Sequence, residues 1–251
     1  MNIFDTIILS ITQGLAEWLP ISSSGHLILW EKWLAIKEAS LGFDIFLHLA
    51  SLLVLLIFFR KEIRSVARDF FGRPDQNSEH HRWGWYIILS TAITALIGYF
   101  FYDRMDAFRQ PHSVAVFFIV TGILVLATKF CQGAKKMNLT LAVVLGLMQG
   151  LAVLPGLSRS GSVIALALIL GLNKKEAFEY SFILAIPAII GAFILSENTL
   201  VFHPYMIFGF ALTALVSFLA LSWLRSIMNR DYFYWFSFYT LILGITVLLL
   251  P

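Results

Sequence analysis

The chain has 251 residues, of which 59% are hydrophobic and only 13% are charged, and its mean hydropathy is +0.82. Because a soluble domain carries about 25% charged residues, this composition excludes a soluble globular fold. The net charge of +3 does not indicate a nucleic-acid partner, since the basic residues lie mostly between apolar stretches. The single cysteine excludes an intrachain disulfide.

Several stretches are long enough to cross a bilayer, which takes roughly 17–25 apolar residues. Six are predicted to do so: 43–59, 83–101, 114–130, 176–195, 204–224 and 232–250. No signal peptide is evident, because the first basic residue is Lys32, so we expect the first helix to stay in the mature protein. The sequence predicts an all-α, polytopic membrane protein with one membrane domain, 1–251.

Two further apolar stretches are each interrupted by a polar segment with Gly and Pro. Residues 3–19 and 27–34 flank the segment 20–26 (PISSSGH), and residues 139–154 and 163–172 flank the segment 155–161 (PGLSRSG). Irregular backbone is tolerated at membrane depth only where it is buried in protein or lines a wet cavity. Each stretch is therefore predicted to be a re-entrant helical hairpin.

The two hairpins resemble each other. Gln13–Ala16 recurs as Gln149–Ala152, and Ser22–Gly25 falls on Ser158–Gly161, both 136 positions apart. The repeat predicts two halves, 1–130 and 137–251. Inverted repeats with broken helices typically place the working site where the halves meet.

Lys and Arg residues predict the orientation. The 60–82 loop holds six of them; if it is cytoplasmic, thirteen lie on that side and four, including Lys37, on the other. Both termini and the entrance to the first hairpin are then outside, and the second hairpin enters from the cytoplasm. His80 and His81, in the same loop, are expected to be solvated.

Ionisable residues inside membrane segments indicate function. The candidates are Glu17, His26, Asp44 and Arg159. Gln13 and Glu17 share one helix face; Glu17 could be a base or metal ligand, and His26 a proton carrier. Alternatively, Glu17 forms a structural salt bridge.

Serines accompany both groups of charged residues. Ser22, Ser23 and Ser24 offer nucleophiles or donors, or merely satisfy the turn. In the second break, Gly156, Ser158 and Ser160 surround Arg159 just before a helix. A helix N-terminus and a guanidinium favour phosphate, while a structural Arg159–Glu17 pair is the alternative, and the two can coexist.

These motifs are recognisable. Residues 13–26 (QGLAEWLPISSSGH) resemble the first signature of the bacterial undecaprenyl-pyrophosphate phosphatase family, of the bacitracin-resistance type, and residues 155–161 resemble the second. The resemblance covers nearly the whole chain. It implies hydrolysis of undecaprenyl pyrophosphate to the monophosphate and inorganic phosphate, which recycles the carrier for cell-wall glycans. It also implies a divalent cation, Mg²⁺ or Ca²⁺, and a site opening to the outer face of the cytoplasmic membrane.

By the same resemblance, Glu17 is the essential carboxylate and a metal ligand, and Gln13 is its upstream neighbour. Ser23 and His26 form the nucleophile or acid–base pair, and Arg159 holds the pyrophosphate. Gly156, Ser158, Ser160, Ser22 and Ser24 complete the expected substrate contacts. Two positions depart from the family: Gln13 removes one carboxylate from a two-carboxylate metal site, and Val163 stands where Thr is common, with Ser162 beside it.

The resulting hypothesis is that Glu17, His26 and Arg159 share one wet pocket, with the lipid tail between the spans. The expected partners are the polyprenyl pyrophosphate lipid, membrane lipids and, as an option, a second copy of the chain forming a homodimer. The rival from another class is a transporter or flippase of polyprenyl phosphate lipids. A structural scaffold is the third alternative, which the buried Glu, His and Arg disfavour.

Overall fold

The computed structural model describes residues 2–34, 41–72, 80–195 and 204–249. Within these ranges the chain is helical apart from turns and one isolated bridge between Lys135 and Leu172, as the sequence predicts. The helices are α1 (Ile3–Ala16), α2 (Ser23–Trp33), α3 (Leu41–Phe58), α4 (Arg60–Phe71), α5 (Trp83–Tyr102), α6 (Met105–Phe108), α7 (Pro111–Ala127), η1 (Thr128–Phe130), α8 (Leu139–Leu151), α9 (Arg159–Ile169), α10 (Lys174–Leu195), α11 (Met206–Asn229), η2 (Phe233–Trp235) and α12 (Phe236–Leu249).

The number of helices that could cross a membrane is smaller than predicted. Among the described residues four qualify by length and composition: α5, α7 continued by η1, α10 and α11. α3 and α4 make a fifth candidate if they count as one span, although they bend by 74°. The predicted crossing at 232–250 is shorter because a turn at Asp231, with φ of 63°, and η2 take up its first residues. The protein is multi-pass, with four or five such candidates.

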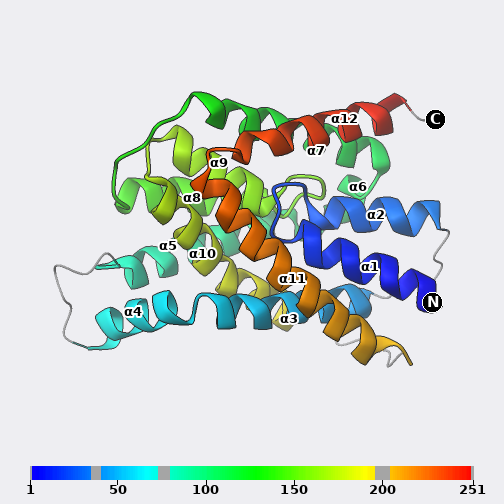
Figure 1. Cartoon of the computed structure of the whole chain (residues 1–251), viewed down its shortest axis with the longest axis horizontal. Helices are drawn as coiled ribbons and strands as arrows, with labels where there is room; N and C mark the ends of the chain where they lie inside the picture. The colour runs from blue at the N-terminus through cyan, green and yellow to red at the C-terminus, as the bar shows by residue number, and fades with distance from the viewer. Residues whose placement is uncertain (1, 35–40, 73–79, 196–203, 250–251) are drawn as a thin grey trace.

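Each predicted hairpin is a pair of short, separately capped helices. Asn2 and Asn138 cap α1 and α8 with their side chains, and Ser22 and Ser158 cap α2 and α9 by accepting from the N–H groups of Gly25 and Gly161. The caps are again 136 positions apart. α1 packs on α2 and α8 on α9, and Figure 1 shows the first pair on the side of the termini and the second pair toward the opposite side.

The first helix of each hairpin packs on a long helix from the other half of the chain. α1 lies against α11, and α8 against α5. The contacts correspond: Thr213 Oγ1 donates to the Ser10 carbonyl at 3.1 Å, and Thr94 Oγ1 donates to the Gly146 carbonyl, also at 3.1 Å. Because Ser10 and Gly146 are equivalent in the repeat, the two halves are interleaved, and both breaks lie in the interior.

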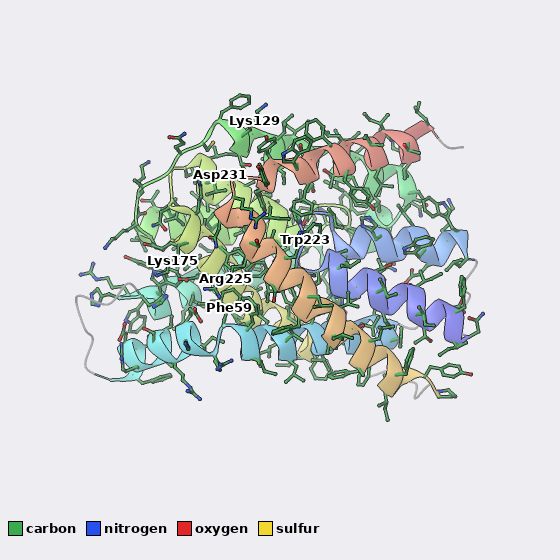
Figure 2. All side chains as sticks on the ribbon, in the orientation of Figure 1. Phe59, Lys129, Lys175, Trp223, Arg225 and Asp231 are labelled. Atoms are coloured by element: carbon green, nitrogen blue, oxygen red, sulfur yellow. The ribbon has the colours of Figure 1, made fainter. Side chains whose placement is uncertain are left out.

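Both termini lie at one edge of the molecule, and α4 lies at the opposite edge (Figure 1). Figure 2 shows Lys129, Lys175 and Arg225 well away from the edge of the termini. Two residues of the predicted charge asymmetry, Lys37 and Arg73, lie outside the described residues. The positions of Lys129, Lys175 and Arg225 agree with the predicted basic end.

His80 corrects the expectation of a solvated histidine. Its ring is buried, with 8% of the residue exposed, and packs edge-on against Trp83. Its Nδ1 lies 3.2 Å from Ser65 Oγ, and its Nε2 lies 3.3 Å from Glu179 Oε2. The expectation failed because it ignored the buried Glu179 of α10, which provides His80 with a partner inside the protein.

We predict that Gly146→Ala destabilises the protein. A Cβ there would fall 2.8 Å from Ser90 Cα and 2.9 Å from its carbonyl oxygen, and backbone atoms cannot move aside as a flexible side chain can. The expected loss of unfolding free energy is about 1–3 kcal/mol, measurable by denaturant titration in micelles. Gly191→Ala is the control, because nothing lies within 4 Å of its Cβ position; equal stability of the two variants would contradict the close crossing of α5 and α8.

Candidate active site

The two hairpins meet at an ion pair. Glu17 follows α1, and Arg159 is the first residue of α9. Arg159 Nη2 donates to Glu17 Oε1, and the two side chains are only 15% and 7% exposed. The guanidinium also lies over the Trp18 ring, 5.7 Å from its centroid, where the ring stabilises a cation. The structural pairing considered from the sequence is therefore present, inside the candidate site.

The second oxygen of Glu17 is surrounded by three more side chains. Ser23 Oγ donates to Glu17 Oε2 at 2.7 Å, and Gln13 Nε2 donates to it at 3.2 Å. His48 Nε2, from α3, lies 3.5 Å from the same oxygen. The Gln13–Glu17 bond agrees with the shared helix face predicted from the sequence. A buried carboxylate is costly unless it is paired and hydrogen-bonded, and here four side chains provide that compensation.

A cavity of about 330 Å³ opens beside this carboxylate. Both polar and apolar side chains line it. The polar lining consists of Glu17, Ser22, Ser23, Ser24, His48, Thr94, Gln149, Ser158 and Arg159. The apolar lining includes Ala16, Ile45, Leu49, Ala152, Val153, Leu157, Ala188, Ile189, Ala192 and Phe193. A cavity with charged and apolar parts inside a membrane protein suits an amphiphile.

Some predicted contact residues support the walls instead of lining the cavity. Gln13 is completely buried behind Glu17. Ser160 Oγ donates to the Leu19 carbonyl, which ties the second break to the first. Gly156 has φ of +95°, and a Cβ there would fall 2.3 Å from the Val114 carbonyl oxygen, so only glycine suits this turn. Gln13, Ser160 and Gly156 therefore support the wall of the cavity and do not line it.

The departure at Val163 is not compensated by its neighbour. Val163 is fully buried, and Ser162 Oγ donates to the Ser158 carbonyl at 2.6 Å. Neither residue lines the cavity. Ser162 therefore serves the first turn of α9 and adds no hydroxyl to the site.

His26 lies outside the cavity that Glu17 and Arg159 share. Its Nδ1 is 2.8 Å from the Ser22 carbonyl oxygen, and its Nε2 is 2.7 Å from the Tyr239 hydroxyl. Because a carbonyl only accepts, Nδ1 carries the hydrogen, and the neutral ring accepts from Tyr239 at Nε2. The ring also stacks on Tyr239 and contacts Phe118 edge-on. The structure thus brings Glu17 and Arg159 together. The prediction that His26 shares their pocket is wrong.

His48 is the imidazole in the cavity, and the sequence analysis missed it. Its Nδ1 lies 2.8 Å from the carbonyl oxygen of Asp44, one helical turn earlier, which directs Nε2 toward Glu17. The signal was available: a histidine within an apolar span is itself a functional indicator. The side chain is 30% exposed, so it can contact a ligand in the cavity.

The side chains around Glu17 do not fit a resident divalent cation. Both carboxylate oxygens already accept from protein donors, and a cation would compete with Arg159. Asp44, the other predicted carboxylate, does not line the cavity. Among the described residues no group of three or more His, Cys, Asp or Glu side chains could hold a metal.

We predict that Glu17→Gln destabilises the protein more than it does in combination with Arg159→Gln. The single change leaves a mostly buried guanidinium without its carboxylate, which costs about 3 kcal/mol, whereas the double change removes both charges. Unfolding titrations of the two variants measure the difference. The control is Lys174→Gln in the exposed pair with Asp231, expected to cost less than about 1 kcal/mol. A loss in the double variant equal to the sum of the losses in Glu17→Gln and Arg159→Gln would show that the pair is not coupled.

Known proteins resemble this chain over nearly its whole length. The family model of bacitracin resistance protein BacA matches residues 6–246. The undecaprenyl-diphosphatase of Carboxydothermus hydrogenoformans is 39% identical over 100% of this chain and 98% of its own. Those of Methanobrevibacter smithii and Treponema denticola are each 38% identical over 98% of this chain, covering 97% and 96% of their own. The matched region includes both hairpins and every polar residue of the cavity, and the chain belongs to the bacitracin resistance protein BacA family.

Proposed function

We propose that the protein hydrolyses undecaprenyl pyrophosphate to undecaprenyl phosphate and inorganic phosphate, and so recycles the lipid carrier of cell-wall glycans. Its family and the names of its relatives support this activity. The observation that carries it is the Glu17–Arg159 pair in a cavity that is lined by polar and by apolar side chains. This arrangement suits a diphosphate attached to a hydrocarbon chain.

The diphosphate would bind at the start of α9. Arg159 offers a planar fork for phosphate oxygens, and the N-terminal turn of α9 adds the positive end of the helix dipole. The hydroxyls of Ser22, Ser24 and Ser158 line the same part of the cavity. These donors would stabilise the charge that shifts during phosphoryl transfer, which is the main catalytic requirement of such a reaction.

Ser23 is the proposed nucleophile, with Glu17 as its base. The 2.7 Å hydrogen bond between them supports transfer of the hydroxyl proton to Glu17 as Ser23 Oγ attacks the terminal phosphorus. The bond from that phosphorus to the bridging oxygen breaks, and undecaprenyl phosphate leaves. Water then attacks the phosphoserine, Glu17 returns a proton to Ser23, and inorganic phosphate is released.

His26 would act as a positioning residue. Its contacts with the Ser22 carbonyl and Tyr239 support a role in fixing the turn that carries Ser22, Ser23 and Ser24. This role replaces the proton carrier predicted from the sequence. His48, in contrast, faces both Glu17 and the cavity.

The proposed topology has six crossings, which are the four candidate spans, α3, and the shorter helix α12 together with η2. Two re-entrant hairpins complete two inverted halves, 1–130 and 137–251. The corresponding caps, the equivalent bonds from Thr213 and Thr94, and the shared edge of both termini support it. With the basic end in the cytoplasm, the protein would lie in the cytoplasmic membrane and take its substrate from the outer face. A homodimer stays a prediction.

A divalent cation, Mg²⁺ or Ca²⁺, also stays a prediction. Since the side chains around Glu17 do not fit a resident ion, a cation would enter only as part of the substrate, chelated by the diphosphate. Mg²⁺ is commonly bound in this way, through substrate phosphates with few protein ligands. The proposed steps do not depend on it.

The assay is phosphate release from undecaprenyl pyrophosphate by the purified protein. We predict that Glu17→Gln, Ser23→Ala and Arg159→Lys each lower kcat/KM by about a hundredfold or more, because they remove the proposed base, the nucleophile and the planar phosphate-binding fork, respectively. Thr128→Val, a buried hydroxyl away from the cavity, is the control. Full activity in all three variants would contradict the site. Lipid translocation in proteoliposomes without phosphate release would favour the flippase, and Ser23→Ala alone retaining activity would make water the nucleophile.

The apolar part of the cavity should hold the first units of the lipid tail. Ala188 lines it beside Pro187, the proline inside α10. We predict that Ala188→Trp lowers kcat/KM for a C55 or C15 pyrophosphate at least about tenfold, because the indole fills the space of the tail. Dimethylallyl pyrophosphate, which has a five-carbon chain, should be affected less. Ala211→Trp, on the exposed side of α11, is the control, and an equal loss for long and short substrates would contradict the tail position.

A further inference from the structure

The cavity at Glu17 is too small to enclose the whole of the proposed substrate. Its volume of about 330 Å³ lies near the lower end of the range of about 300–1,000 Å³ that holds a drug-sized ligand. A C55 tail together with a diphosphate is much larger than such a ligand. Most of the tail must therefore leave the cavity through its wall.

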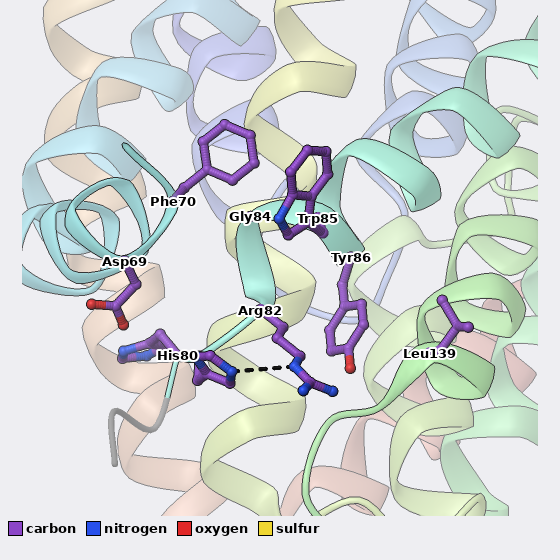
Figure 3. A pocket seen from close by; sticks show the side chains of 9 residues that line it. Asp69, Phe70, His80, Arg82, Gly84, Trp85, Tyr86 and Leu139 are labelled. Atoms are coloured by element: carbon purple, nitrogen blue, oxygen red, sulfur yellow. Dashed lines mark hydrogen bonds between the residues drawn. The ribbon is translucent and has the colours of Figure 1, made fainter. Parts of the chain in front are cut away.

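A second cavity does not provide the space for the rest of the tail. It measures about 520 Å³ and lies between α4 and the start of α5 (Figure 3). The two cavities share no lining residue, so the tail cannot pass from one into the other. The tail must reach the bilayer by another path.

The wall of the catalytic cavity is thin on the side of α10. The residues of α10 that line it are Ala188, Ile189, Ala192 and Phe193. Ala192 is also exposed on the outside of the protein, whereas the other described residues that line the cavity are buried or half-buried. A Cβ at the neighbouring Gly191 would meet no described atom within 4 Å. At Ala192 a single small side chain therefore separates the cavity from the surroundings of the protein.

The outside of α10 at this place faces the hydrocarbon of the bilayer. α10 is one of the candidate spans, and the exposed side chains next to Ala192 are apolar, namely Ile190, Ile194 and Leu195. Such side chains in a membrane span lie against lipid. Since α10 begins with Lys174 at the basic end and ends at Leu195, the proposed orientation places Ala192 in the outer leaflet.

We propose that the lipid substrate enters the cavity sideways from the outer leaflet, through an opening at Ala192, and that its tail extends through this opening into the bilayer during the reaction. The first units of the tail would lie against Ala188 and Ala192, and the rest would stay in lipid. This inference rests on the proposed hydrolysis and adds the path by which the substrate reaches Glu17.

Closing the opening tests this path. We expect Ala192→Trp to lower kcat/KM for C55 pyrophosphate in vesicles about tenfold or more, because the indole blocks the way of the tail. Dimethylallyl pyrophosphate is soluble in water and has no long tail to pass through the opening, so its loss should stay below about threefold. Ile194→Trp is the matched control, because Ile194 is exposed on the same turn of α10 and does not line the cavity; it should hydrolyse both substrates as the unmodified protein does.

A spin label detects the tail directly. The label is attached to Ala192→Cys in the background Cys131→Ser, which removes the natural thiol of the chain. Undecaprenyl phosphate, the proposed product, should immobilise the label, and dimethylallyl phosphate should leave it mobile. The same label at Ile194→Cys should respond to neither compound.

Equal kcat/KM for the C55 substrate in Ala192→Trp and Ile194→Trp would overturn the path, and so would an equal loss for both substrates in Ala192→Trp. A label at position 192 that undecaprenyl phosphate leaves mobile would also overturn it, and this measurement decides if Ala192→Trp does not fold. Failure of the proposed hydrolysis would look different, because the unmodified protein would then release phosphate from neither substrate.

Discussion

The fold of this protein depends on how one buried carboxylate is compensated. Glu17 stands at the end of a short helix inside the molecule, where an unpaired charge would be prohibitive. Arg159, Ser23, Gln13 and His48 reach it from four segments of the chain. Because the arginine begins α9 and the glutamate ends α1, the same bond that satisfies the charge also joins the two irregular breaks. Structure and proposed chemistry therefore rely on one interaction.

The position of the breaks follows from packing that crosses between the halves. α11 packs against α1, and α5 packs against α8. Thr213 and Thr94 donate matching hydrogen bonds to the carbonyl oxygens of Ser10 and Gly146. Ser160 adds a direct bond from the second break to the Leu19 carbonyl of the first. A short helix that ends inside a membrane protein exposes unpaired backbone groups, so it must end against protein. Interleaving gives both hairpins such a surface and leaves the cavity between them.

The two histidines near the site show how helix geometry separates sequence neighbours. His26 is only three residues from Ser23, yet its ring turns back to the Ser22 carbonyl and toward Tyr239 of α12. His48 is distant in sequence, but α3 carries it to the carboxylate. The proposed roles follow these directions, with His26 fixing the serine turn and His48 facing the ligand.

The sequence by itself determined the helical membrane fold, both breaks and the Gln13–Glu17 face, because composition, the Gly and Pro residues of the breaks and the i, i+4 spacing act locally. It also identified the family. Only the tertiary structure decided that His26 leaves the cavity, that His48 enters it, that His80 is buried on Glu179, and that one predicted crossing is short. Each of these depends on which helix packs against a given side chain. That choice is made by contacts between residues far apart in the chain, which local patterns do not encode.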